Sequence, residues 1–487
     1  MMETGDYTRK FSERMRLFLL GRKLSASSLS REMGYTSRNS FFRVLNDECS
    51  YTIQREFYKR LCAVASLNLT PEEKAWLEEG LEVTRIGISR IAYHRAMTAL
   101  VLEGETKPEE IHVTDEKTGQ ERSMMDCLRP VFETSGELYI SQCICRPIYD
   151  VMEKLIRSCT ADGAKPHIYH LIDASGPEAV RAMHAIQPVM YCSCYTGYTP
   201  KDGDLFQYCS GNWIIGAFKE DGMQNTVILA ETADGEFCYS VLKGDELFQY
   251  ERHVYQEKCR HMRAIKTIFA RSGTPEDYIW LSEQYGKLEK NRELYDIRYD
   301  IPINAIPPEI IREALLDGSR QVGFGTEEIR AALVEAFVAV QAKRFENTFH
   351  KRRVTHTILS YAQMENFAVT GRHSDHFFAM RSYTHQERQT ILRLMRDQTL
   401  NNPYFSLYFF RPGLEPINQE VGLYEGKGVL FTKGQTDYKL DGHAEAMIER
   451  SDFCQGFKDF FLNDLLPNRV VSKQQTLAYL DALLALC

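Results

Sequence analysis

Two pairs of closely spaced cysteines are the first groups in this sequence that could do chemistry. Cys143 pairs with Cys145, and Cys192 with Cys194, each across one residue. On a strand, the side chains of such a pair point to one face, so the pairs could bind zinc or iron, or sense oxidants as thiolates. Structural metal sites, however, usually take cysteines separated by two residues in a turn, and reduced cysteine packs as a small apolar residue. We expect buried thiols and no metal; a cysteine-based redox or metal sensor or enzyme is the first alternative.

A loose group of histidines follows in the second half of the sequence. His373, His376 and His385 lie near Asp375, but they offer no carboxylate-backed helical pair for a metal. The segment VGFGTEE, from Val322, lacks the preceding strand and third glycine of a phosphate-binding loop. The sequence contains no nucleophile elbow, Walker loop or HExxH segment. We therefore expect no enzymatic activity and no cofactor.

A set of polar side chains near the N-terminus has the chemistry of nucleic-acid recognition. Arginine binds guanine or phosphate, asparagine binds adenine, and an exposed phenylalanine can contact a thymine methyl group. Hydroxyl and amide groups at the start of a helix bind phosphates. The residues of this set are Ser27, Ser28, Ser37, Arg38, Asn39, Ser40, Phe42, Arg43 and Asn46.

Short amphipathic helices must position this set. Residues 7–69 show apolar side chains at helical spacing, interrupted by glycines and by serine or threonine caps. Gly21 ends the first helix, and Gly34 turns the chain after the second, because glycine adopts the left-handed conformation without a Cβ penalty. A third helix, capped by Ser37 or the residue before it, leaves the polar set outside. Its inward residues are Phe41, Val44 and Leu45.

The segment LSASSLSREMGY, Leu24 to Tyr35, followed by a helix that ends in RVLN, resembles the lambda-repressor-like helix-turn-helix family of bacterial transcription regulators, the XRE type. The resemblance covers residues 7–69, and we identify no family for the remainder. It implies that Ser37 to Arg43 lies in the major groove and that two copies bind paired half-sites as a homodimer. One departure is that the first inward apolar residue after Tyr35 comes one position later than is usual in the family.

Charge is unevenly distributed along the chain. Residues 1–69 contain 12 basic and 7 acidic residues, a net charge of +5, whereas the remaining residues contain 47 and 60, a net charge of −13. The overall charge of −8 argues against non-specific polyanion binding by the whole molecule. A basic head on an acidic body instead favours nucleic-acid binding at one end.

The composition predicts a cytoplasmic protein that does not enter a membrane. The first residues, MMETGDYTRKFSER, lack the apolar core of a signal peptide. No segment approaches the roughly 18 consecutive apolar residues of a membrane span. The 13 cysteines are odd in number and widely spread, as expected for reduced thiols.

A length of 487 residues predicts about three domains. We expect a multidomain α and α/β (α+β) fold, with an all-α helix-turn-helix bundle, a helical connector and a C-terminal α/β body. The expected parts are a DNA-binding domain (1–69), a connector and candidate dimer contact (70–103), a first α/β sensor module (123–270), a helical segment (271–350) and a second α/β sensor module (351–487).

An internal similarity suggests that the two α/β modules are related. The segments that begin at Tyr149 and at Glu387 each contain an apolar-striped helix, a polar turn and a strand that alternates aromatic and aliphatic residues. Any helix-turn-strand unit can produce this pattern, so unrelated modules are the alternative.

The sequence thus predicts a sequence-specific DNA-binding transcription regulator. In this hypothesis the body responds to a small-molecule effector or an assembly signal and changes the spacing of two heads on double-stranded DNA. A protein-interaction scaffold with a non-DNA-binding helical head is the second alternative.

Overall fold

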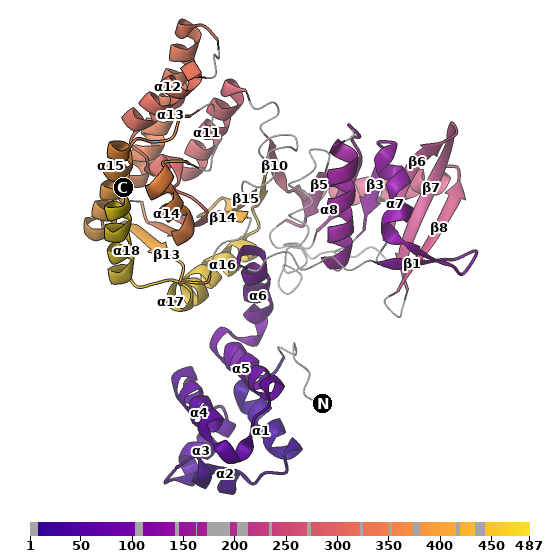
Figure 1. The fold of residues 1–487 in the computed structure, drawn as a ribbon. Coiled ribbons are helices and arrows are strands. Elements are labelled where there is room, and N and C mark those ends of the chain that lie inside the picture. The colour runs from indigo at the N-terminus through magenta and orange to yellow at the C-terminus, as the bar shows by residue number, and fades with distance from the viewer. Residues whose placement is uncertain are drawn as a thin grey trace. The chain divides into compact units, whose positions relative to one another are not determined.

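The computed structural model describes residues 8–102, 111–141, 146–161, 163–172, 195–201, 213–232, 236–269, 274–321, 325–349, 353–373, 380–414, 419–433 and 444–487. The chain divides into two compact units, an N-terminal unit, Met1–Ala96, and a C-terminal unit, Met97–Cys487. Figure 1 shows the helices and strands of both.

The N-terminal unit is helical throughout its regular structure. Several of its helices end near a glycine, as the sequence predicts. Serine or threonine occupies the N-cap position of four of them, but of these four residues only Thr70 makes a side-chain capping hydrogen bond. Its elements are α1 (Phe11–Gly21), α2 (Ala26–Glu32), α3 (Arg38–Leu45), α4 (Tyr51–Ala63), a 3₁₀ turn (Ala65–Leu67), α5 (Pro71–Ile86) and the first part of α6 (Ile88–Leu102).

The core of the N-terminal unit forms from the apolar stripes of these helices. Phe11, Phe41 and Phe57 come from three different helices, are fully buried and meet ring to ring, with centroid separations of 6.1 Å for the first and third and 5.0 Å for the second and third. Such aromatic pairs favour edge-to-face or tilted geometries. The core thereby fixes α3 against α1 and α4.

Helix α5 belongs to this core and does not extend away from it as a connector. It begins with a capping box between Thr70 and Glu73, and it buries Trp76 and Leu77 among the side chains of α1 and α4. The fully buried Arg14 donates to the Trp76 carbonyl oxygen at 2.5 Å and to the Glu79 carboxylate at 3.0 Å. The N-terminal unit therefore includes α5 and extends to Ala96.

The first sheet of the C-terminal unit has the strand order β2-β1-β8-β7-β6-β3-β4-β5-β9 among the described residues. Its strands are β1 (His112–Asp115), β2 (Glu121–Ser123), β3 (Glu137–Ile140), β4 (His167–Leu171), β5 (Tyr195–Thr199), β6 (Trp213–Glu220), β7 (Met223–Glu231), β8 (Phe237–Lys243) and β9 (Arg263–Ala264). The helices described with it are α7 (Met124–Glu133), α8 (Arg146–Ala161) and α10 (Glu246–Cys259).

The second sheet has the strand order β10-β16-β15-β14-β11-β12-β13. Its strands are β10 (Lys266–Phe269), β11 (Leu294–Arg298), β12 (Thr355–Leu359), β13 (Phe405–Phe409), β14 (Gln419–Tyr424), β15 (Gly428–Lys433) and β16 (Ala444–Ile448). Its helices are α11 (Pro275–Glu289), α12 (Pro308–Gln321), α13 (Glu327–Phe349), α14 (Tyr361–Thr370), α15 (His385–Asn401), α16 (Ser451–Phe460), α17 (Leu466–Asn468) and α18 (Lys473–Leu486), with a 3₁₀ helix at Ile303–Ala305 and a π-helical segment at Phe461–Leu465.

The two sheets share one connectivity. In the first, β3, β4 and β5 run parallel in chain order, and β6, β7 and β8 continue antiparallel from the other side of β3. In the second, β11, β12 and β13 run parallel, and β14, β15 and β16 continue antiparallel from the other side of β11. The fold is therefore a mixed helix-and-sheet, multidomain architecture, as predicted.

The two segments that the sequence analysis paired do not occupy equivalent positions in the two sheets; they differ by one strand. The helix-turn-strand segment from Tyr149 leads into β4, the second parallel strand of its sheet, whereas the segment from Glu387 leads into β13, the third. The counterpart of β4 is β12. The range 271–350, expected to be helical, also contains β11, the central strand of the second sheet.

Candidate functional site

The turn between α2 and α3 has the geometry that the glycine at its centre predicts. Gly34 has φ = +74°, its N–H donates to the Arg31 carbonyl oxygen at 3.0 Å, and the Tyr35 N–H donates to the Ser30 carbonyl oxygen at 3.0 Å. These two bonds are those of a Schellman motif, which ends a helix and turns the chain sharply. The turn sets the direction in which α3 starts.

Helix α3 separates an apolar face from a polar one. Phe41, Val44 and Leu45 are buried, as predicted. At about 100° per residue, Asn39 and Arg43 lie on the opposite side of the helix, in one row with Asn46. All three are exposed. The outer surface of α3 is thus polar, with the Phe42 ring, 41% exposed, beside this row.

The structure places most of the predicted set on the surface of α2 and α3. Ser27 is half-buried, and Arg38 is the first residue of α3, its side chain lying outside the described part. The exposed members are Ser28, Ser37, Asn39, Ser40, Phe42, Arg43 and Asn46. We name the seven exposed residues the α3 surface.

Acidic groups border the α3 surface at the end of the helix. The Arg43 guanidinium donates to the Glu48 carbonyl oxygen at 3.4 Å, and Asn46 donates to the Glu48 carboxylate at 3.4 Å. Asp47 is held by Lys10 at 2.8 Å, and this hydrogen bond raises the pKa of Lys10. Arg43 therefore remains within reach of a ligand, because its described protein contact is a long bond to a neutral oxygen.

A second polar group lies on the second sheet. The Tyr295 hydroxyl on β11 donates to the Glu293 carboxylate at 2.8 Å, and Lys458 on α16 lies 3.3 Å from the same carboxylate and 5.1 Å from the Tyr295 ring centroid. The Tyr295 ring stacks on His356 of β12, with centroids 5.3 Å apart. Burial lowers the pKa of Lys458, but its hydrogen bonds to Glu425 and Glu293 outweigh burial and raise the pKa above its usual value. Burial, with Glu293, raises the pKa of Tyr295 to about 12, and burial lowers the pKa of His356.

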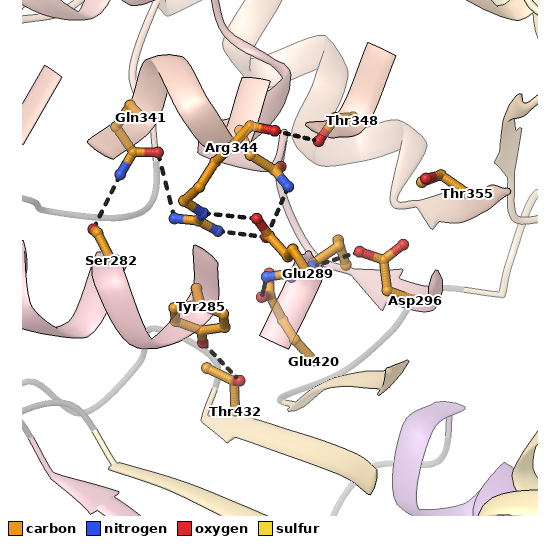
Figure 2. A network of polar contacts seen from close by, with 12 residues as sticks. Ser282, Tyr285, Glu289, Asp296, Gln341, Arg344, Thr348, Thr355, Glu420 and Thr432 are labelled. Atoms are coloured by element: carbon orange, nitrogen blue, oxygen red, sulfur yellow. Dashed lines mark hydrogen bonds and ion pairs between the residues drawn. The ribbon is translucent and has the colours of Figure 1, made fainter. Parts of the chain in front are cut away.

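The opposite face of this sheet carries a buried charge network (Figure 2). Arg344 of α13 donates twice to Glu289 of α11, at 2.8 and 3.0 Å, and both side chains are almost completely buried. Gln341 links Arg344 to Ser282, and Asn304 donates to Glu289 at 2.9 Å. Because each charge has several partners, this pair ties α11 to α13.

The same network continues onto the strands. The Tyr285 hydroxyl donates to the Glu445 carboxylate of β16, next to Thr432 of β15. Arg298 on β11 donates to Asp296 at 3.0 Å and to Glu420 at 2.8 Å. Burial and the neighbouring Glu445 raise the pKa of Tyr285 well above its usual value. None of these residues was singled out from the sequence.

The remaining sequence-predicted groups do not gather into a site among the described residues. Cys143, Cys145, Cys192 and Cys194 lie outside the described residues, as do Asp375, His376 and the first three residues of the VGFGTEE segment. His373 is buried and contacts the Ile301 carbonyl oxygen at 2.6 Å, while His385 is exposed at the start of α15. Within the described ranges no cluster of three metal-ligating side chains occurs, and none of the helices there is long and apolar enough to span a bilayer.

Comparison with known proteins finds similarity among solved structures. No model of a known protein family matches this chain, and no curated protein is similar to it at a significant level. Among solved structures, the crystal structure of phosphatidylserine synthase from Haemophilus influenzae Rd KW20 aligns over 81% of this chain and 96% of its own length, at 8% identity and a TM-score of 0.27. A TM-score at this level carries no argument about the fold or the substrate of this chain.

The prediction of an effector-controlled transcription regulator is corrected here. The structure that aligns is a phosphatidylserine synthase and not a DNA-binding regulator, so this likeness gives that prediction no support. That assignment rested on 69 N-terminal residues, and no observation on the C-terminal unit connects a ligand there to the N-terminal helices. We do not retain it.

Proposed function

We propose that α1 to α4 form a helix-turn-helix bundle and that the α3 surface contacts double-stranded DNA. This proposal concerns the N-terminal unit and the DNA that it would bind, and assigns no role to the C-terminal unit. The observation that carries it is the separation of faces on α3, where Phe41, Val44 and Leu45 are buried and Asn39 and Arg43 are exposed. A helix of this kind fits the major groove and presents its outward side chains to bases and phosphates.

Two further features support this partner. The Schellman turn at Gly34 ends α2 and turns the chain sharply into α3, as the turn of a helix-turn-helix requires. The N-terminal unit also keeps a positive charge when its boundary is set at Ala96, with 16 basic and 12 acidic residues. A local excess of positive charge attracts a polyanion even when the whole chain is acidic.

The proposal is tested by fluorescence anisotropy of a labelled duplex with the full-length chain. We expect dissociation constants of about 10 µM or lower at physiological salt, weakening steeply as salt rises. Arg43→Ala should weaken binding and lower the salt slope by about one if Arg43 contacts a phosphate. Asn39→Ala should weaken binding without changing that slope.

Lys74→Ala provides the matched control. Lys74 is an exposed cation of the same unit, but it lies on α5, which packs on α1 and α4. Loss of the same affinity in Lys74→Ala and Arg43→Ala would mean that only net charge matters, and the α3 surface would be rejected. A full-length chain that does not bind duplex DNA at low salt would reject the partner itself.

A further inference from the structure

A cavity of about 510 Å³ opens beside Lys458 in the C-terminal unit. Its walls come from the turn between β14 and β15, from the end of β16, from α16, and from Arg263 of β9. Small-molecule sites typically enclose about 300–1,000 Å³. The cavity therefore has the size of a binding site for a small metabolite.

Helix α16 turns one face toward this cavity. Ser451, Cys454, Gln455 and Lys458 line it and follow the i, i+3, i+4, i+7 spacing of a single helical face. The N-terminus of α16 lies at Ser451, so the partial positive charge of that end adds to the ammonium of Lys458. This wall therefore favours an anionic group.

Charges of both signs line the same cavity. The cations are Arg263, Lys427 and Lys458, and the carboxylates are Glu425 and Glu449. Lys458 lies 3.1 Å from Glu425 and 3.3 Å from Glu293, which is outside the lining, and Arg263 lies 3.5 Å from Glu449. Two of the three lining cations are therefore paired with carboxylates of the same lining.

We propose that this cavity binds a small zwitterion of the amino-acid class. Its carboxylate would face Lys458 and the start of α16, and its ammonium group would face Glu425 or Glu449. A ligand that carries one charge of each sign keeps the charges of the lining paired. A simple anion would compete for Lys458 and leave the Glu425 carboxylate without its cation, which is costly where water is partly excluded.

Isothermal titration of the full-length chain with each of the twenty L-amino acids tests the ligand class. Acetate and ethylamine, which carry one half of the charge pair each, are the single-charge probes. We expect at least one amino acid to bind with a dissociation constant of about 1 mM or below, and both single-charge probes to bind at least about tenfold more weakly. Absence of amino-acid binding, or equal binding of acetate or ethylamine, would overturn the proposal.

Two variants test the location. Lys458→Met removes the central cation and should weaken amino-acid binding by about 10- to 100-fold, as expected for a lost hydrogen bond to a charged group. Gln455→Trp fills the cavity from the exposed surface of α16 and leaves all three cations in place, so it decides the question if Lys458→Met does not fold.

The control is Lys473→Met, which removes an exposed lysine at the start of α18, outside the cavity lining. The Lys473→Met protein should bind the amino acid with the same affinity as the parent. Binding that survives Gln455→Trp unchanged, in a protein with the thermal unfolding profile of the parent, would place the ligand elsewhere and overturn the proposal.

Discussion

The two sheets of the C-terminal unit share a connectivity but differ in the side chains of one face. On one face they match: Glu137 and Tyr139 on β3 correspond to Glu293, just before β11, and Tyr295 on β11, and each tyrosine hydroxyl donates to its own glutamate. A cation from the closing helix approaches each glutamate, Arg252 of α10 at 3.5 Å in the first sheet and Lys458 of α16 at 3.3 Å in the second.

On the other face the two sheets diverge. Ile140, fully buried on β3, has its counterpart in the buried Asp296 on β11, and the buried Phe237 on β8 has its counterpart in Glu445 on β16. The backbone hydrogen bonds that define a sheet do not depend on side-chain polarity. Connectivity can therefore persist while the packing against it changes from apolar to charged.

The buried pair of Glu289 and Arg344 tests this difference most strongly. Arg344→Met removes the guanidinium and leaves the Glu289 carboxylate buried without its main partner, so the second sheet and its helices should lose about 3–5 kcal/mol of unfolding free energy. Urea denaturation followed by tryptophan fluorescence measures the loss.

The control for this variant is Arg252→Met in the first sheet. The Arg252 side chain is 37% exposed, so its removal should cost about 1 kcal/mol or less. Similar losses in the two variants would contradict the distinction between a buried charge pair and a partly exposed one.

The hydrogen bond from Tyr285 to Glu445 should have an intermediate effect with a characteristic pH dependence. Tyr285→Phe leaves a buried carboxylate with one donor fewer and should cost about 1.5–3 kcal/mol near neutral pH. Because burial and Glu445 raise the pKa of Tyr285 in the folded state, the parent should lose stability as the pH rises above 10, where the unfolded state ionises first.

Tyr285→Phe should lose less stability than the parent over this alkaline range. Tyr255→Phe is the matched variant in the first sheet, where the buried hydroxyl donates to the Ile140 carbonyl oxygen at 3.1 Å. Its cost should be about 1 kcal/mol. Thermal unfolding between neutral and alkaline pH compares all three proteins, and an unchanged alkaline slope in Tyr285→Phe would contradict the role given to this hydroxyl.

The matched glutamates should give the smallest effects. The hydrogen bond from Tyr295 lowers the pKa of Glu293; burial opposes this shift and Lys458 supports it. The ionised Glu293 carboxylate therefore stabilises the folded state above pH 4.5, and this stabilisation is lost as the pH falls further. The Glu293 side chain is 43% exposed, so solvent screening limits the cost of Glu293→Gln to about 1 kcal/mol at neutral pH. The cost should vanish in acid.

Glu137→Gln in the first sheet is the corresponding control. Its cation is farther away than Lys458 is from Glu293, so a cost of about 0.5 kcal/mol or less is expected. Chemical denaturation at neutral and acidic pH measures both variants. A larger loss of unfolding free energy in Glu137→Gln than in Glu293→Gln would contradict the expected order of the two glutamates.

Several elements of the fold could be predicted because their signals are local. Helix α18, Lys473–Leu486, is one of them, since a serine cap and a continuous apolar stripe mark it in the sequence. The inward side of α3 was likewise predicted from spacing alone, and Phe41, Val44 and Leu45 are buried. Helical periodicity and capping need only neighbouring residues.

The rest depends on partners that lie far apart in the sequence. Strand β11 has only five residues between helical segments. Its Asp296 and Arg298 are charged residue types that are usually exposed, yet both belong to the buried charge network. Lys458 meets Glu293 across 165 residues. The tripeptide Glu-Leu-Tyr, present at 137–139 and again at 293–295, was the available signal that the two sheets correspond, and it was missed.

One feature of the sheets bears on how the chain is made. All described strands of the first sheet lie between residues 112 and 264, so that sheet can close while the ribosome is still producing the second. Strand β10 follows after a single residue, Ile265, yet it pairs with β16, the last strand of the second sheet to be synthesised. Throughout that interval neither side of β10 has a strand partner, and in the folded sheet its outer side remains an edge, because β10 is the first strand of the order. The nascent polypeptide thus passes through a stage of heightened aggregation risk that falls when Ala444–Ile448 leaves the exit tunnel.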